Sequence, residues 1–114
     1  MSYKIKTIPS FDRDAKRLHK RYKLLAEDLR RLVSELKERP LSGVDLGGGV
    51  HKIRLAIKSK GSGKRGGARI ITYADVLLQK KEGTVYLLAM YDKAEQESIS
   101  MKTIRMLLSS VMEE

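Results

Sequence analysis

A glycine-rich cationic stretch at residues 58–69 combines the residue types that hold phosphates. Its sequence, KSKGSGKRGGAR, contains four glycines and five basic residues, with no acidic and no large apolar side chain. Residues 61–66 spell GxGxxG, the pattern with which dinucleotide-binding proteins hold a pyrophosphate at the N-terminus of a helix. The residues that follow, ARIITYADV, predict a strand in place of that helix. A loop of the GxxxxGK[ST] type is also excluded, because Arg65 stands where a Ser or Thr must bind magnesium.

The stretch is therefore predicted to be a mobile hairpin tip that joins two strands. Its glycines allow conformational freedom or a close approach of the backbone. Its cations either bind the phosphates of a polymer or form a solvated tip, and the residues alone leave both alternatives open. The four cations of this tip are Lys58, Lys60, Lys64 and Arg65.

The preceding segment, VHKIRLAIK at residues 50–58, predicts a half-buried strand with a basic outer face. Apolar residues at positions 53, 55 and 57 alternate with Lys52 and Arg54. This period of two is typical of a strand that has one face in the core. The basic face is either an ordinary solvated surface or part of a site that binds phosphate.

The charge of the chain indicates a polyanionic partner. The 114 residues include 24 Lys and Arg against 14 Asp and Glu, a net charge of +10. Residues 41–73 carry seven basic side chains and one acidic side chain, whereas residues 74–114 carry five and seven. Such an uneven basic surface is typical of proteins that bind nucleic acid or the ribosome.

Composition excludes several other classes of site. The absence of cysteine excludes thiolate metal sites, disulfides and cysteine nucleophiles, and His19 and His51 are too far apart in sequence to indicate a metal site. We expect no metal and no other cofactor. The length predicts a single domain over residues 1–114. Since the N-terminus lacks the apolar segment of a signal peptide and the longest apolar run is VYLLAMY, a cytoplasmic protein is expected.

The elements that must position these residues predict an α+β fold. We expect an antiparallel helical hairpin packed on a mostly antiparallel sheet of about four strands, with a short N-terminal strand and a C-terminal helix. Residues 40–50, which contain three consecutive glycines, are predicted to be a loop. The predicted elements are a strand at 2–8, helices at about 10–22 and 24–38, strands at 50–58, 68–79 and 84–91, and a last helix that contains residues 104–111.

Residues 51–73, HKIRLAIKSKGSGKRGGARIITY, resemble the RelE/ParE superfamily of toxins from bacterial type II toxin–antitoxin systems. The shared pattern is a KIRL strand, a hairpin rich in Gly and Lys, and a strand that opens on an arginine. Residues 87–100, LLAMYDKAEQESIS, resemble the last strand of the family and the basic residue just beyond it. The resemblance extends over nearly the whole chain and is closest to the RelE/HigB-like ribonucleases.

The resemblance implies the RelE-like microbial ribonuclease fold and a toxin that cuts mRNA in the ribosomal A site without a metal ion. In that chemistry a ribose 2′-hydroxyl attacks the adjacent phosphate and leaves a 2′,3′-cyclic phosphate or its opened form. The reaction needs a proton acceptor at the 2′-hydroxyl, cations at the phosphorane and a proton donor for the leaving 5′-oxygen.

The resemblance also implies roles for individual residues. Arg69 corresponds to the arginine that opens the strand after the loop, where a guanidinium can hold a phosphate with two parallel hydrogen bonds. Lys52 and Arg54 fall at basic positions of the preceding strand, and Lys93 corresponds to the late basic catalytic residue of the family. Charge stabilisation is assigned to Arg69 and Arg54, and the base is left open between Lys52 and Lys93.

The sequence departs from the family just after Lys93. Many relatives carry a catalytic tyrosine several residues further on, whereas residues 94–100, AEQESIS, contain no aromatic side chain. Tyr91 and Tyr73 are the candidates to replace it, and Tyr73 is also expected to contact RNA.

A toxin of this kind implies a cognate antitoxin that masks the basic surface, together with mRNA and the 70S ribosome as targets. No membrane partner is expected. Two alternatives remain: a ParE-like poison of DNA gyrase on the same fold, and a non-catalytic module that binds RNA or the ribosome. The basic face of Lys52, Arg54 and Arg69 argues against the first alternative, because a gyrase-binding protein has no need of a phosphate site.

Overall fold

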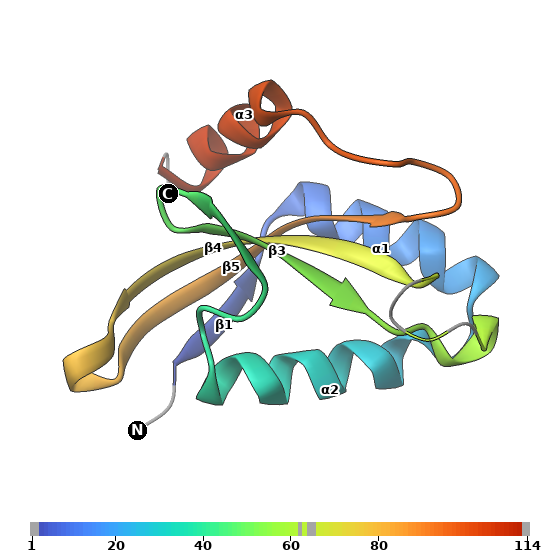
Figure 1. Cartoon of the computed structure of the whole chain (residues 1–114), viewed down its shortest axis with the longest axis horizontal. Coiled ribbons are helices and arrows are strands. Elements are labelled where there is room, and N and C mark those ends of the chain that lie inside the picture. The colour runs from blue at the N-terminus through green and yellow to red at the C-terminus, as the bar shows by residue number, and fades with distance from the viewer. Residues whose placement is uncertain (1–2, 62, 64–65, 113–114) are drawn as a thin grey trace.

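The architecture, seen in a computed structural model that describes residues 3–61, 63 and 66–112, is α+β as expected. A strand is followed by two helices, four further strands and a last helix (Figure 1). The elements are β1 (Lys4–Thr7), α1 (Pro9–Arg21), α2 (Leu25–Glu38), β2 (Val44–Gly47), β3 (Val50–Leu55), the short 3-10 helix η1 (Lys58–Lys60), β4 (Ala68–Leu77), the short 3-10 helix η2 (Leu78–Lys80), β5 (Glu82–Asp92) and α3 (Met101–Met112).

The strands form one five-stranded sheet in the order β1-β5-β4-β3-β2. The β1–β5 pair is parallel and the other three pairs are antiparallel, so the prediction of a mostly antiparallel sheet is confirmed. The predicted number of about four strands is too low, because β2 lies in the segment at 40–50 that was expected to be a loop. The three glycines at 47–49 do not prevent regular structure there. They adopt positive φ angles and turn the chain back, so that β2 pairs with β3.

The core lies against β4 and β5, the two central strands. Residues 87–92 are buried at every position, so both faces of β5 are covered, and α1 and α3 each pack against this strand. In Figure 1, α2 lies below the strands and α3 above them. The predicted apolar stripes of the two N-terminal helices are confirmed as core, with Phe11, Leu18, Leu25, Leu32 and Leu36 all buried.

One edge of β5 is covered by a helix rather than by a strand. The pairing of β1 with β5 ends at Leu87, and α1 begins two residues after β1 with Pro9. The fixed φ of proline suits the first turn of a helix, which explains why α1 starts there. The side chain of Asp14 in α1 then accepts a hydrogen bond of 3.0 Å from the backbone N–H of Met90. The end of β5 is thereby held between α1 and the central sheet.

Candidate active site

Three of the predicted site residues form a row across the sheet. In the strand register Arg54 of β3 lies opposite Arg69 of β4, and Arg69 lies opposite Tyr91 of β5. Residues that face each other in antiparallel strands share one face of the sheet, with Cβ atoms about 5 Å apart. Like charges directly opposite one another destabilise a sheet. A pair of facing arginines is therefore a feature that stability alone would not favour.

Lys52 extends this row by one position along β3. It lies two residues before Arg54 and hence on the same face, and its partner on β4 is Ile71. Lys52 is half-buried and Arg54 is exposed, whereas Arg69 is only 6% exposed. The prediction that Lys52 and Arg54 come near Arg69 is thus confirmed by the register. The cations of the row on β3 therefore reach the solvent, whereas Arg69 on β4 is buried.

The buried end of the row consists of Arg69 and Tyr91. One guanidinium nitrogen of Arg69 donates to the carbonyl of Ala68 at 3.2 Å. Burial raises the pKa of the Tyr91 hydroxyl, and the nearby positive charge of Arg69 opposes that rise. Among the described residues this hydroxyl has no hydrogen-bond partner. A neutral phenol beside a guanidinium can donate a proton but is poorly suited to accept one.

Lys93 is brought to the same end of the sheet by its backbone. Its N–H donates to the carbonyl of Gly67 at 3.2 Å, which joins the turn after β5 to the start of β4, two residues from Arg69. Gly67 itself packs closely on β3, since a Cβ atom there would lie 1.9 Å from the carbonyl oxygen of Leu55. Three chain segments converge at this point. The side chain of Lys93 is half-buried.

The loop that carries the other predicted cations is partly structured. The N–H of Lys58 donates to the buried carboxylate of Asp28, the hydroxyl of Ser59 accepts from the N–H of Leu24, and the ammonium of Lys60 donates to Asp92 at 2.8 Å. The expectation of a mobile tip is therefore wrong for residues 58–60, because contacts with the helical hairpin and with β5 hold them in η1. Lys64 and Arg65 lie outside the described residues.

Tyr73 lies on the face of the row but further along β4. It stacks on Tyr86 of β5 with ring centroids 6.2 Å apart and an angle of 22° between the rings. Four residues separate it from Arg69, which corresponds to roughly 13 Å along a strand. The structure therefore does not bring Tyr73 into the row.

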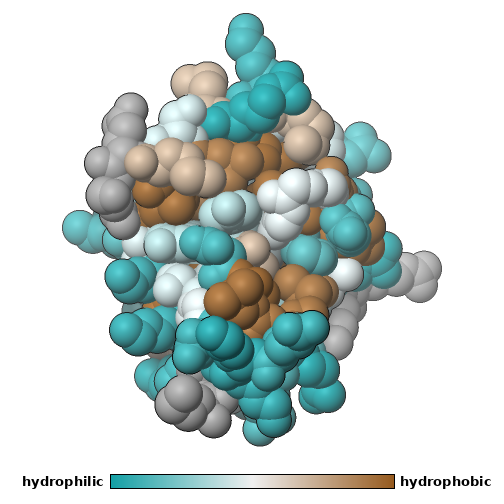
Figure 2. Space-filling view, turned by 90° about the vertical axis from the view of Figure 1, so that its left-hand side faces the viewer, coloured by the Kyte–Doolittle hydropathy of each residue, from teal (hydrophilic) through white to brown (hydrophobic). Residues whose placement is uncertain are grey.

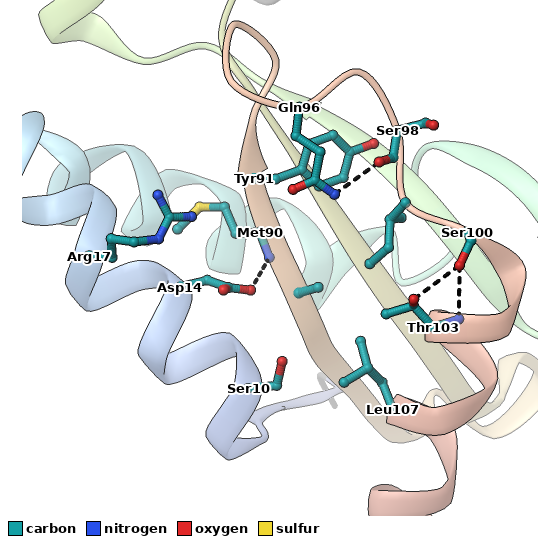
Figure 3. A pocket seen from close by; sticks show the side chains of 12 residues that line it. Ser10, Asp14, Arg17, Met90, Tyr91, Gln96, Ser98, Ser100, Thr103 and Leu107 are labelled. Atoms are coloured by element: carbon teal, nitrogen blue, oxygen red, sulfur yellow. Dashed lines mark hydrogen bonds between the residues drawn. The ribbon is translucent and has the colours of Figure 1, made fainter.

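A pocket of about 300 Å³ opens beside Tyr91, between α1, β5, α3 and the segment that connects β5 to α3. Figure 3 shows Tyr91, Gln96 and Ser98 together at one end of it, and Ser10 and Leu107 toward the other. The amide of Gln96 donates to the carbonyl of Ser98, and the hydroxyl of Ser100 accepts from the N–H of Thr103 and so caps α3. The segment after β5 is thus an ordered cover over Tyr91.

Sequence reasoning missed the acids that organise this region. Asp14 and Asp28 each accept a backbone hydrogen bond from a distant part of the chain, and Asp92 accepts from the side chains of Lys60 and Tyr22. Asp28 and Asp92 are fully buried charged residues. A signal existed only for Asp92, which stands next to Lys93 in the segment that resembles the family. The contacts of Asp14 and Asp28 join residues 30 or more positions apart, and the local pattern does not reveal them.

The described part of the chain contains neither a cluster of metal ligands nor a helix that could span a membrane. Among residues 3–61, 63 and 66–112 there is no group of three or more His, Cys, Asp or Glu side chains that could hold a metal ion. Across those same ranges, no helix has the length and the apolar character needed to cross a membrane.

The surface at the other end of β4 has a different character. Leu77 and Leu78 are 59% and 52% exposed where the β4–β5 hairpin ends. Figure 2 views this side of the molecule and shows apolar side chains at the surface between hydrophilic ones. Leu77 lies eight residues from Arg69, which is roughly 26 Å along a strand. The cations and the exposed leucines therefore occupy opposite ends of the central strands.

Comparisons with known proteins agree with this architecture. Residues 10–111 match the family model described as RelE toxin of RelE/RelB toxin-antitoxin system. Among solved structures, the chain is similar to E. coli toxin RelE in the free state, in a form with two arginines replaced by alanine, with a TM-score of 0.56 and 16% sequence identity. The similarity covers 99% of this chain and 97% of that one. At this identity the likeness supports the fold.

Proposed function

Because the chain belongs to the RelE toxin family of toxin–antitoxin systems, we propose that it is a ribosome-dependent endoribonuclease that cuts mRNA without a metal ion. The observation that carries this proposal is the row of Arg54, Arg69 and Tyr91, with Lys52 and Lys93 beside it. These residues supply the groups that attack of a 2′-hydroxyl on the adjacent phosphate requires.

The two arginines stabilise the phosphorane. Arg54 is exposed and meets the RNA backbone first, and the buried Arg69 on the neighbouring strand binds the phosphate that is cleaved. Two arginines at facing strand positions stabilise the negative charge that develops on the phosphorane, so they favour the transition state over the bound substrate.

Tyr91 supplies the proton for the leaving 5′-oxygen. Its hydroxyl is protonated at neutral pH, because burial raises a pKa that is ordinarily already about 10. The hydroxyl has no hydrogen-bond partner among the described residues that would compete for the proton. The proton acceptor at the 2′-hydroxyl is Lys52 or Lys93. Since Tyr91 is only 3% exposed, the RNA displaces part of the segment at 96–100, which lies beside Tyr91, when it reaches this hydroxyl.

The cognate antitoxin masks the exposed part of the row. We expect the antitoxin to place a segment with carboxylates against Lys52 and Arg54, because these are the cations of the row that reach the surface. Neutralising them blocks the approach of RNA without any contact to the buried Arg69.

Cleavage of a defined mRNA on purified 70S ribosomes tests the proposal. Arg69→Ala and Lys93→Ala should each lower the rate by at least tenfold while the protein stays folded, and the products should carry 2′,3′-cyclic or 3′-phosphate ends. Arg30→Ala is the matched control, since Arg30 is an exposed cation on α2 away from the row.

Three results would contradict the proposal. The first is full cleavage by both folded alanine variants. The second is tight, salt-sensitive binding of the wild type to ribosomes with no cleavage product, which would select a non-catalytic module. The third is a DNA-damage response with intact mRNA in expressing cells, which would select a gyrase poison.

A further inference from the structure

A buried carboxylate at the end of β5 connects four parts of the chain. The side chain of Asp92 is fully buried. One of its oxygens accepts from the ammonium of Lys60 at 2.8 Å and from the N–H of Ala94 at 3.0 Å. The other accepts from the hydroxyl of Tyr22, in the short connection between α1 and α2, at 2.5 Å. Asp92 therefore links the helical hairpin, the cationic loop and the turn after β5.

Lys60 is committed to this carboxylate rather than to solvent. Its side chain is only 16% exposed, and its ammonium lies 5.8 Å from the ring centroid of Tyr22, within the range of a cation–π contact. The guanidinium of Arg21 approaches the same ring and the same carboxylate, at 5.9 Å and 3.7 Å, from the solvent side. By contrast Lys58, two residues before Lys60 in the same short helix, has an exposed side chain.

The turn held by Asp92 is the turn that carries Lys93. The carbonyl of Asp92 accepts from the N–H groups of Glu95 and Gln96, and Glu95 pairs with Arg21 and Arg17 of α1. Lys93 sits between these two anchored acids, and its own N–H is bonded to Gly67 at the start of β4. The position of Lys93 relative to Arg69 therefore depends on how firmly Asp92 is held.

We propose that Asp92, together with Lys60 and Tyr22, is a positioning device that sets Lys93 and the cationic loop against Arg69, and that Lys60 consequently does not bind RNA. The inference rests on the proposed function for its effect on cleavage. Its contacts require only the fold. Lys60 acts through Asp92, and Lys58 is the cation of this short helix that meets phosphates.

Two matched lysine variants separate positioning from RNA binding. Lys58→Met should weaken binding to 70S ribosomes and lower the magnitude of the salt slope, d log K/d log[salt], by about 1. Lys60→Met should leave that slope unchanged while the single-turnover cleavage rate falls, on the order of 100-fold for a displacement of about 1 Å. An equal loss of slope in both variants would overturn the proposal.

A double-mutant cycle tests whether Lys60 works through Asp92. Asp92→Asn with Lys60→Met should be no slower in cleavage than either single variant. Its melting temperature should lie above that of Lys60→Met, because the double variant no longer buries a carboxylate that has lost its closest cation. Tyr22→Phe, which keeps all charges, should lower kcat and leave KM unchanged. Additive effects of Lys60→Met and Asp92→Asn on both readouts would contradict the device.

The cycle remains decisive if the proposed function fails. A wild type that does not cleave on ribosomes refutes the endonuclease, whereas the salt slopes and the melting temperatures still report on the Lys60–Asp92 pair. A cleaving wild type with additive variants refutes the positioning device alone.

Discussion

Two buried hydroxyls of the sheet, those of Tyr91 and Thr72, have no hydrogen-bond partner among the described residues. A buried hydroxyl without a partner has lost its hydration with no compensation, so each one destabilises the fold. Tyr91 lies in the row with Arg69, whereas Thr72, an odd number of positions from Arg69 along β4, faces the other side of the sheet. Tyr91 and Thr72 can therefore be compared as two buried hydroxyls, of which only that of Tyr91 has a proposed chemical role.

Tyr91→Phe should lower cleavage without lowering stability. We expect the free energy of unfolding to stay the same or rise by up to about 1 kcal/mol, as for Thr72→Val. Only Tyr91→Phe should slow cleavage, by roughly 100-fold or more, because it removes the proposed proton donor. Urea unfolding and ribosome-dependent cleavage measure the two effects, and wild-type cleavage by Tyr91→Phe would exclude this donor.

The buried carboxyl group of Asp14 should make the stability of the fold depend on pH, because its ionised form at neutral pH disfavours folding. Burial raises its pKa, and the bond from the Met90 N–H and the charges of Arg17 and Arg13 only partly offset that rise. A carboxyl group whose pKa is raised by folding stabilises the folded state below its unfolded pKa of about 3.9. That stabilisation is lost as the pH rises through the pKa that the group has in the folded protein. Asp14→Asn keeps an acceptor for Met90, so it should be more stable than the wild type at pH 7 and lose that advantage as the pH falls toward 4.

Thermal melts across pH 3.5–7 would measure this difference. Asp14→Ala is the control, because it removes the charge and also the acceptor, and it should melt below Asp14→Asn at every pH. If Asp14→Asn were less stable than the wild type at pH 7, the carboxylate would be favourable and the argument from burial would be wrong.

The sequence could predict the row but not the contacts that hold it. Alternation along β3 places Lys52 and Arg54 on one face, and hairpin pairing brings them opposite β4. The row could therefore be predicted from residues that are close together in the sequence. The buried state of Tyr91 depends on the segment after β5, and the fixed position of Lys60 depends on Asp92, which is 32 residues away. Such contacts between distant residues have no local pattern.

At the level of strands and helices, the predictions failed where glycine-rich segments were taken to exclude regular structure. The three glycines at 47–49 supply a turn that permits β2, and those of the cationic loop do not prevent residues 58–60 from being fixed by Asp28 and Asp92. Helices and central strands were predictable because their apolar periods match the faces that they bury. Glycines do not follow a periodic pattern in the sequence. Whether one of them forms a turn or allows close packing depends on the backbone of neighbouring segments.

Gly67 should tolerate substitution much less well than Gly61 of the same loop. An added Cβ would lie 1.9 Å from the carbonyl oxygen of Leu55, a backbone atom that cannot move without separating β3 from β4. Gly67→Ala should therefore cost at least about 2 kcal/mol more than Gly61→Ala, which meets only the penalty of a positive φ with open space around it. Because the Gly67 carbonyl holds Lys93, cleavage should also be lost.

Urea unfolding of the two glycine variants gives the comparison directly. Gly61→Ala is the matched control, since Gly61 belongs to the same loop and has φ 70°. Equal stability of the two variants would mean that β3 and β4 can separate at this point without cost, and the close packing would then not be what fixes Lys93.

At the level of the whole molecule, the proposed site lies at one end of β4 and two exposed leucines lie at the other. Arg69 and the residues around it form the proposed phosphate site at one end, and Leu77 and Leu78 are exposed roughly 26 Å away along the strand. Sites this far apart with no shared partners act independently. Substitutions at the two ends should therefore affect different properties of the protein.

Arg54→Ala should weaken binding to 70S ribosomes and lower the magnitude of the salt slope by about 1, because one phosphate contact is lost. Leu77→Ser combined with Leu78→Ser should leave both the affinity and the slope unchanged, since these changes alter no charge and lie far from the row. Binding titrations at several salt concentrations measure both effects, and combining all three substitutions should give the Arg54→Ala result alone. If the leucine variant bound ribosomes as weakly as Arg54→Ala, the hairpin end would belong to the ribosome-binding surface, and the division along β4 would not be functional.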